Sequence, residues 1–420
     1  MRVLLFAFGS RGDVQPFVAL AKGLQRAGYE VALAAGVNYG AWIQSEGVAF
    51  EALPFDIQAM VNSDVGVNWI DGKRTTPLDE LRSMKKMAEQ PAAAIADLIV
   101  SLIDRYDVFI SGALTLDALR AAAQARGKKL VAGLMSPWAP TRSGAAGMQA
   151  PLPNTTSILN YAMGYLIEAM MFNVLYAPSR EVRQRFHLPP PSRSEYMRTW
   201  NRTPALIGVS PLVMPPPRDW ESHLHVTGYW FLDTPEGWEP PAPLTAFLEA
   251  GEPPVYMGFG SMSSRNPEST LRLLLEGVAR SGQRAVIHSG GAGLAADALP
   301  PTVYMLDSAP HEWLFPRMAA IIHHGGAGTT AAGLRSGRPS AVISHVGDQP
   351  YWGRRIHALK VGAAPVTRSA LTVDKLSGMI RELTTDRGLQ ERARDFGERL
   401  RAEDGVGNAV RAFQQIVNTA

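Results

Sequence analysis

The sequence predicts an α/β protein with two doubly wound domains that face one another across a cleft. Its 420 residues exceed what one hydrophobic core usually organises. A strand–helix–strand series opens the chain, and a second series begins at Val255. The proline-rich stretch Pro211–Pro217 between them is typical of a linker. We therefore expect domains at 1–215 and 216–400, followed by a last helix at 401–420.

The first series begins with the apolar run Arg2–Phe8, which predicts a buried parallel strand. After a loop at 9–15, a helix is predicted to open with Pro16 and to end at Gly28. Proline is favoured at the first helical position, and glycine just past the last one. Three further apolar runs of this domain have the length of strands: Tyr29–Ala35, Val108–Ser111 and Leu130–Leu134.

The second series repeats this pattern. Four of its apolar runs are predicted as strands: Val255–Phe259, Arg284–His288, Met318–Ile322 and Ser340–Ser344. Two helices are predicted between them, near Glu268–Ser281 and at Thr329–Ser336. Gly337 follows the second helix as its expected stop signal.

The segment His323–Thr330 is the glycine-rich turn His-His-Gly-Gly-Ala-Gly-Thr-Thr, between a predicted strand and a predicted helix. Glycines let the backbone approach a ligand closely, and a helix N-terminus offers unpaired N–H groups to an anion. The turn lacks the Gly-Lys-Ser/Thr ending of a Walker A motif and differs from the usual dinucleotide fingerprint. It predicts either a diphosphate site or a turn that only packs helix against strand.

Asp348 and Gln349 follow the next predicted strand, where open α/β sheets bind their ligands. A carboxylate that accepts hydrogen bonds from two neighbouring hydroxyls discriminates sugars by geometry. We therefore interpret this pair as sugar-binding residues beside a phosphate loop, which indicates a nucleotide-sugar site. The alternative is an ordinary Gly-Asp-x-Pro turn. Trp352 either packs this loop or lines an acceptor opening.

The run from His311 to Gly362 resembles the donor-binding segment of inverting UDP-sugar glycosyltransferases with the GT-B fold, that is, two facing Rossmann-like domains. It is most similar to that of the sterol 3-β-glucosyltransferases, and bacterial antibiotic glycosyltransferases share part of the pattern. Four other segments support the resemblance in the order the family has them: Gly9–Asp13, Thr227–Phe231, Tyr256–Met262 and Pro310–Pro316. The resemblance also implies that the last helix returns to the N-terminal domain.

The resemblance implies roles for individual residues. His324, Thr329 and Ser261 match diphosphate contacts, and His311 lies where the family grips the uracil. Gly326 and Gly328 belong to the same phosphate loop, and Gly328 replaces an asparagine of plant relatives.

One position departs from the family pattern. Ala332 stands where plant relatives place a glutamate that holds the ribose, which leaves dTDP open beside UDP as the donor nucleotide. His323 is either a packing residue or part of the donor site.

Asp13 is the candidate general base. It follows the first strand, and the resemblance implies an aspartate base here in the sterol and antibiotic branches. The alternative is that Asp13 only caps the following helix.

The amino-acid composition excludes several kinds of site and partner. There is no cysteine, which excludes disulfides, thiolate nucleophiles and Cys-based metal sites. A net charge of +3 without a basic block indicates no nucleic-acid partner. Because the chain begins directly with a strand, we expect no signal peptide and a cytoplasmic protein.

The apolar stretch Ile158–Tyr176 contains Glu168, which disfavours a spanning helix. This stretch is either buried core or a contact to a lipophilic acceptor or a membrane surface.

These observations predict an inverting glycosyltransferase that moves glucose from UDP-glucose to a hydroxyl of a lipophilic, sterol-like acceptor. No metal or other cofactor is expected, as the resemblance implies. The main alternative is an antibiotic-tailoring enzyme that uses a UDP- or dTDP-sugar. A nucleotide-sugar epimerase and a non-catalytic nucleotide-binding protein are further alternatives. The sequence does not indicate the oligomeric state.

Overall fold

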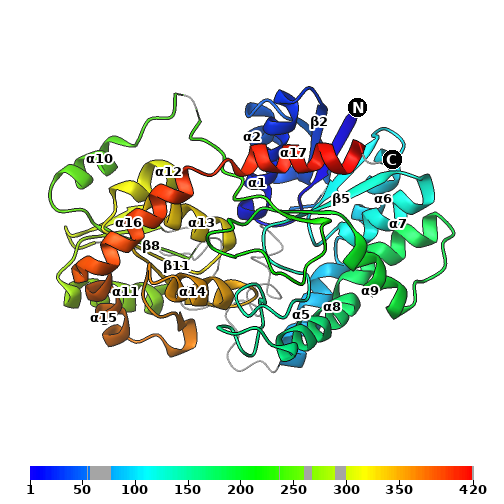
Figure 1. Cartoon of the computed structure of the whole chain (residues 1–420). Helices are drawn as coiled ribbons and strands as arrows, with labels where there is room; N and C mark the ends of the chain where they lie inside the picture. Colours follow the sequence, from blue (N-terminus) through cyan, green and yellow to red (C-terminus); the bar gives the residue numbers. More distant parts are fainter. Residues whose placement is uncertain (54, 57–76, 236, 260–266, 289–298, 419–420) are drawn as a thin grey trace. The chain divides into compact units, whose positions relative to one another are not determined.

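The structure of the chain is a computed structural model (Figure 1). It describes residues 1–420 except 54, 57–76, 236, 260–266, 289–298 and 419–420. Contacts divide the described residues into two compact units. The first runs to Leu232 and resumes at Glu403, and the second is Asp233–Ala402. Both divisions lie downstream of the boundaries expected at 215–216 and 400–401.

The first unit is built on a parallel sheet with the strand order β3-β2-β1-β4-β5-β6-β7. Each pair of neighbouring strands is parallel, and the alternating apolar faces form two core layers, one on each side of the sheet. The strands are β1 (Arg2–Phe6), β2 (Glu30–Gly36), β3 (Ala49–Leu53), β4 (Val108–Ser111), β5 (Lys129–Leu134), β6 (Ala205–Ile207) and β7 (Leu224–Val226). Because the strand order reverses beside β1, the carboxyl ends of β1 and β4 flank a crevice at the topological switch point.

Helix α1 (Arg11–Arg26) corrects the sequence prediction, which began this helix at Pro16. Ser10 is its N-cap, and Asp13 lies in the first turn rather than on a loop. The early start has a local cause, since the Ser10 and Asp13 side chains form a reciprocal capping box. Pro16 lies inside the helix, where its missing N–H costs one backbone hydrogen bond.

The remaining helices of the first unit cover both faces of the sheet. They are η1 (Val37–Tyr39), α2 (Gly40–Ser45), α5 (Pro77–Glu89), α6 (Ala92–Leu102), α7 (Leu116–Arg126), α8 (Ile158–Arg185), α9 (Arg193–Arg202) and α17 (Gly405–Asn418). The last, α17, packs against α1 and β6 (Figure 1). Its Asn408 donates a hydrogen bond to the carbonyl of Thr227 at 2.9 Å, and Phe413 is fully buried.

Helix α8 extends beyond the apolar stretch Ile158–Tyr176 noted in the sequence. It continues through Pro178 to Arg185, because the buried residues Val174, Leu175 and Ala177 hold this part of the helix in the core. Its first turns are exposed instead. Among the residues described, α8 alone has the length and apolar composition of a membrane-crossing helix.

The second unit contains a parallel sheet with the strand order β10-β9-β8-β11-β12-β13. Its strands are β8 (Val255–Gly258), β9 (Ala285–His288), β10 (Val303–Leu306), β11 (Ala320–His323), β12 (Ser340–Ser344) and β13 (Val366–Thr367). Its helices are α10 (Ala242–Glu249), α11 (Pro267–Ser281), α12 (His311–Leu314), η3 (Phe315–Arg317), α13 (Ala327–Ser336), α14 (Gln349–Ala358), η4 (Arg368–Ala370), α15 (Val373–Thr385) and α16 (Arg387–Arg401). Gly337 ends α13 with a φ of 71°, as its stop signal predicted.

We expect Gly405→Ala to destabilise the first unit. A methyl group at Gly405 collides with the backbone carbonyl of Tyr229, which cannot move as a flexible side chain can. The cost is about 2 kcal/mol or more. Gly378→Ala is the matched control, because nothing lies within 4 Å of its added methyl group inside α15. Differential scanning calorimetry should show a lower Tm for the first variant and an equal or higher Tm for the second.

Candidate donor and base sites

The glycine-rich turn lies at the switch point of the second sheet. Strand β8 has β9 on one side and β11 on the other, so the strand order reverses between β8 and β11. The turn follows β11 and leads into α13, whose N-cap is Gly326. Its first-turn N–H groups, which include those of Gly328 and Thr329, therefore lie at the carboxyl edge of the sheet, where the helix dipole favours an anion.

His323 holds this turn in place. Its side chain is fully buried, and its Nδ1 accepts a hydrogen bond from the N–H of Gly325 at 3.0 Å. This contact assigns the ring proton to Nε2. Gly325 has a φ of 97°, which favours glycine, and an added Cβ would lie 2.7 Å from the side chain of Val342. The sequence left the role of His323 open, and the structure assigns it a specific contact with the turn.

His324 is the predicted phosphate contact. Burial lowers its pKa to about 4, although a hydrogen bond with the backbone of Gly258 acts in the opposite direction. The ring lies against the turn, because a Cβ on Gly326 would be only 2.6 Å from its Nε2. His324 is therefore neutral at pH 7 before a ligand binds, and its single ring N–H is engaged with the backbone of Gly258. Protonation beside a bound anion would give the ring a second N–H for a phosphate oxygen.

Polar atoms around the turn lie buried without a hydrogen-bond partner among the described residues. They include Nε2 of His323, Nδ1 of His324 and Oγ1 of Thr330. Thr330 is fully buried on α13, whereas its neighbour Thr329, the predicted hydroxyl donor, keeps some exposure. Buried polar groups usually have partners, so such a group of unsatisfied atoms is typical of a site that awaits a polar ligand.

Asp348 and Gln349 lie beside the same turn. An added Cβ on Gly325 would be 2.9 Å from the carbonyl oxygen of Gln349. The Gln349 amide oxygen accepts hydrogen bonds from the N–H groups of His345 (2.7 Å) and Val346 (3.2 Å), so it shapes the loop before α14. Asp348 is the N-cap of α14, and its Oδ2 accepts a hydrogen bond from the indole of Trp352 at 2.8 Å. The structure thus brings the sugar-binding candidates and the phosphate loop together.

Trp352 is fully buried, which supports the loop-packing alternative for this residue.

His311 begins α12, and its ring stacks on Phe315 with the centroids 4.2 Å apart. His311 and Ala332 line a groove of the second unit. Glu312 and Arg335, which form an ion pair, line the same groove. Ser261 lies outside the described residues.

Asp13 lies at the switch point of the first sheet. Its Oδ2 accepts two hydrogen bonds from Ser10, from the N–H at 2.7 Å and from the hydroxyl at 2.9 Å. Asp13 therefore takes part in the helix cap that the sequence analysis offered as its alternative role. The guanidinium of Arg11 lies 4.3 Å from the ring centre of Trp42, and burial lowers the Arg11 pKa.

Sequence reasoning missed two contacts. The Ser10–Asp13 pair has a signal in the sequence, because Ser-x-x-Asp spacing before an apolar helix is typical of a capping box. The bond from Gly325 to His323 had no sequence signal, because it depends on the path of the backbone through the turn.

Among the described residues, no group of three or more His, Asp or Glu side chains is arranged to hold a metal ion.

We predict that His323→Ala weakens the binding of a nucleoside diphosphate, probed with UDP and dTDP, roughly tenfold, because it leaves the Gly325 N–H without its buried acceptor. His323→Asn should retain most of the affinity, since its side-chain oxygen can take the place of Nδ1. Isothermal titration calorimetry measures both variants, and a melting curve checks their folding. Wild-type affinity in the alanine variant would contradict the role of this bond.

Protonation should destabilise the second unit in acid. The folded-state pKa of His324, about 4, lies below its ordinary value of 6.5, and burial also holds the pKa of His323 well below that value. The unfolded chain therefore binds protons that the folded unit rejects, so stability is full above pH 6.5 and falls as the pH drops. For His324 the loss by pH 5 is about 2 kcal/mol. Urea denaturation at pH 7 and 5 should show a smaller difference in His324→Gln than in wild type.

Two protein-family models match the chain, each mostly within one of the two units. Residues 3–132 match the glycosyltransferase family 28 N-terminal domain, and residues 272–407 match the erythromycin biosynthesis protein CIII-like C-terminal domain.

Two relatives illustrate the sequence similarity. Sterol 3-beta-glucosyltransferase UGT80A2 of Arabidopsis thaliana is 32% identical over 98% of this chain, which spans 65% of that relative. O-mycaminosyltylonolide 6-deoxyallosyltransferase of Streptomyces fradiae is 32% identical over 100% of this chain and 98% of its own length.

Solved structures show the same architecture. The calicheamicin glycosyltransferase CalG4 matches with a TM-score of 0.72 at 15% identity, over 100% of this chain and 99% of its own. At this identity the match concerns the fold, which is the GT-B fold with two parallel-sheet α/β domains. Together with the sequence relatives, it establishes that the chain belongs to the glycosyltransferase family that includes the sterol 3-beta-glucosyltransferases and the antibiotic glycosyltransferases.

Proposed function

We propose that the protein is an inverting glycosyltransferase that moves glucose from UDP-glucose to a hydroxyl of a lipophilic, sterol-like acceptor. The observation that carries this proposal is the joint placement of a glycine-rich helix N-terminus and the Asp348–Gln349 pair at one switch point. The turn would hold the diphosphate, and the pair would hold the sugar hydroxyls. Sequence similarity to sterol 3-beta-glucosyltransferases over 98% of the chain supports the acceptor class.

The leaving group is the diphosphate, which gains negative charge as its bond to the sugar breaks. The N–H groups of Gly328 and Thr329 and the imidazole of His324 are the proposed donors to its oxygens. Fixed donors of this kind lower the barrier without the cost of reorganising water. A bound diphosphate would also raise the pKa of His324 from about 4. We propose that these groups serve in place of a metal ion.

Asp13 is the proposed base. The acceptor oxygen attacks the anomeric carbon, the bond to the diphosphate oxygen breaks, and the hydroxyl proton passes to the Asp13 carboxylate. UDP departs with the bonding electrons, and the configuration at the anomeric carbon inverts. The two hydrogen bonds from Ser10 fix the direction of the carboxylate, which is a positioning role.

The second candidate is a tailoring enzyme that transfers a deoxysugar from a dTDP or UDP donor to an antibiotic. Two observations favour it. Ala332 places no carboxylate at the position where the family resemblance implies a ribose contact. In addition, the Streptomyces fradiae relative, a 6-deoxyallosyltransferase, matches this chain from end to end.

We expect Asp13→Asn to lower turnover about 10²–10⁴-fold, because a general base contributes that much. UDP affinity should stay unchanged, since the amide oxygen can still accept the bonds from Ser10 and keep the helix cap. Asp104→Asn, at an exposed position of the same unit, is the matched control. Near-normal turnover of Asp13→Asn would contradict the base assignment.

The assay follows UDP or dTDP release by mass spectrometry with sterols, polyphenols and macrolides as acceptors. Release that depends on an added sterol supports the first candidate, and release from a dTDP-deoxysugar with a macrolide supports the second. Turnover of UDP-sugar without any acceptor would indicate an epimerase instead.

A further inference from the structure

We propose that the exposed start of helix α8 docks the first unit on the surface of a lipid bilayer. The surface consists of Ile158, Leu159, Tyr161, Tyr165 and Leu166, and is called the α8 apolar face below. The lipophilic acceptor of the proposed function gives this contact a purpose. The contact itself depends only on the surface of the first unit and can be tested without donor or acceptor.

Large exposed hydrophobic side chains are concentrated at this one place. The described residues contain nine of them, and the α8 apolar face together with Leu152 accounts for six. Leu159 is 57% exposed and Leu166 is 52% exposed. Single exposed apolar side chains are ordinary, but a contiguous group of this kind marks a contact surface.

The helix presents these side chains on one side. Successive residues are about 100° apart around an α-helix, so the five positions fall within an arc of roughly 160°. Asn160 points to the opposite side and is buried, where its amide donates to the carbonyls of Arg142, Leu152 and Thr155 and accepts from the N–H of Leu152. These bonds hold the preceding loop beside the helix start, so the face is presented on a fixed support.

The surroundings lack charge. From 143 to 179 the chain contains no Lys, Arg, His or Asp and a single Glu, Glu168, which is buried. Burial raises the pKa of Glu168 to about 8, against the lowering effects of a hydrogen bond with Asn201 and of Arg120. The carboxyl is therefore mostly neutral at pH 7. Apolar side chains, tyrosines and uncharged polar loops are the composition that the boundary between headgroups and acyl chains accepts.

Cationic side chains flank this uncharged region. Arg142 is exposed directly before it. Helix α5 packs against α8 and carries the exposed residues Arg82, Lys85 and Lys86, of which Lys85 also lies 3.8 Å from Glu89. Basic residues beside an apolar face complement anionic lipid headgroups, which favours a bilayer over an uncharged apolar partner.

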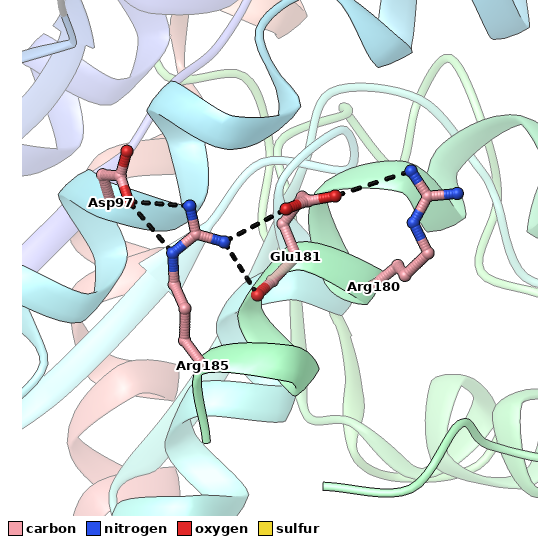
Figure 2. A network of polar contacts seen from close by, with 4 residues as sticks. All are labelled: Asp97, Arg180, Glu181 and Arg185. Atoms are coloured by element: carbon pink, nitrogen blue, oxygen red, sulfur yellow. Dashed lines mark hydrogen bonds and ion pairs between the residues drawn. The ribbon is translucent and has the colours of Figure 1, made fainter. Parts of the chain in front are cut away.

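The other end of α8 excludes insertion of the whole helix. Arg185 donates to Asp97 of α6 at 2.7 and 2.9 Å, and to Glu181 at 3.2 Å. Figure 2 shows these contacts between the side chains. Glu181 also lies 3.5 Å from Arg180. These ion pairs and the buried Val174 and Leu175 fix the C-terminal half in the first unit. The exposed apolar part covers nine residues, short of the roughly 20 needed to span a bilayer. The structure therefore fits peripheral docking.

The test is co-sedimentation of the full chain with sterol-free vesicles of phosphatidylcholine, with and without phosphatidylglycerol. We expect wild type to bind the anionic vesicles more strongly. The double variant Leu159→Gln/Leu166→Gln should reduce partitioning by about tenfold or more, because two apolar side chains leave the acyl boundary. Val37→Gln is the matched control, since Val37 lies in the same unit and is 52% exposed. It should bind as wild type does.

Three outcomes would overturn the proposal. Wild type that stays in the supernatant with both vesicle types shows that no bilayer contact exists. Equal partitioning of the double variant and wild type shows that another surface makes the contact. A drop in melting temperature or a loss of self-association in the double variant, without a change in vesicle binding, shows that protein covers this face. Analytical ultracentrifugation reports the self-association. Because the vesicles contain no sterol, failure of the glucosyl-transfer assay leaves the result valid.

Discussion

Both candidate sites depend on the same constraint, which is the meeting of strand carboxyl ends at the switch point of a parallel sheet. In each unit the first strand, β1 or β8, lies in the middle and the strand order reverses beside it. The crossover connections then leave a crevice at that edge. Asp13 lies at one such edge and the His323–Thr330 turn at the other. Hydrophobic packing of the strands thus decides where polar chemistry can occur.

In the second unit, burial decides the charge of the histidines at the candidate donor site. Burial lowers the pKa values of His323 and His324, so both rings are neutral at pH 7. An uncharged, partly buried set of donors at a helix N-terminus suits a ligand that brings its own negative charge. His323 contributes by holding the Gly325 N–H, and Gln349 contributes by holding the next loop. Burying these polar groups costs free energy, and that cost is offset only when a ligand forms hydrogen bonds with them.

In the first unit, helix α8 divides into two parts with different environments. Its C-terminal half is part of the core and is fixed by Arg185, whereas its first turns present apolar side chains to the outside. Composition alone treats the helix as one apolar segment, which is why the sequence left core and surface contact as alternatives. The burial of each turn depends on the helices that pack on it, and those come from distant parts of the chain.

Apolar runs and glycine positions are local signals, so the sequence alone indicated the glycine turn and eight of the described strands, but not β3, β6, β7, β10 or β13. The predictions Val108–Ser111 and Ser340–Ser344 match β4 and β12 to the residue. The start of α1 was wrong, because the pairing of Ser10 with Asp13 outweighed the preference of Pro16 for the first helical position. Only the tertiary structure decided that Gln349 lies against Gly325 and that His323 accepts its N–H. These contacts depend on how the loops after β11 and β12 approach one another, and no short stretch of sequence encodes that approach.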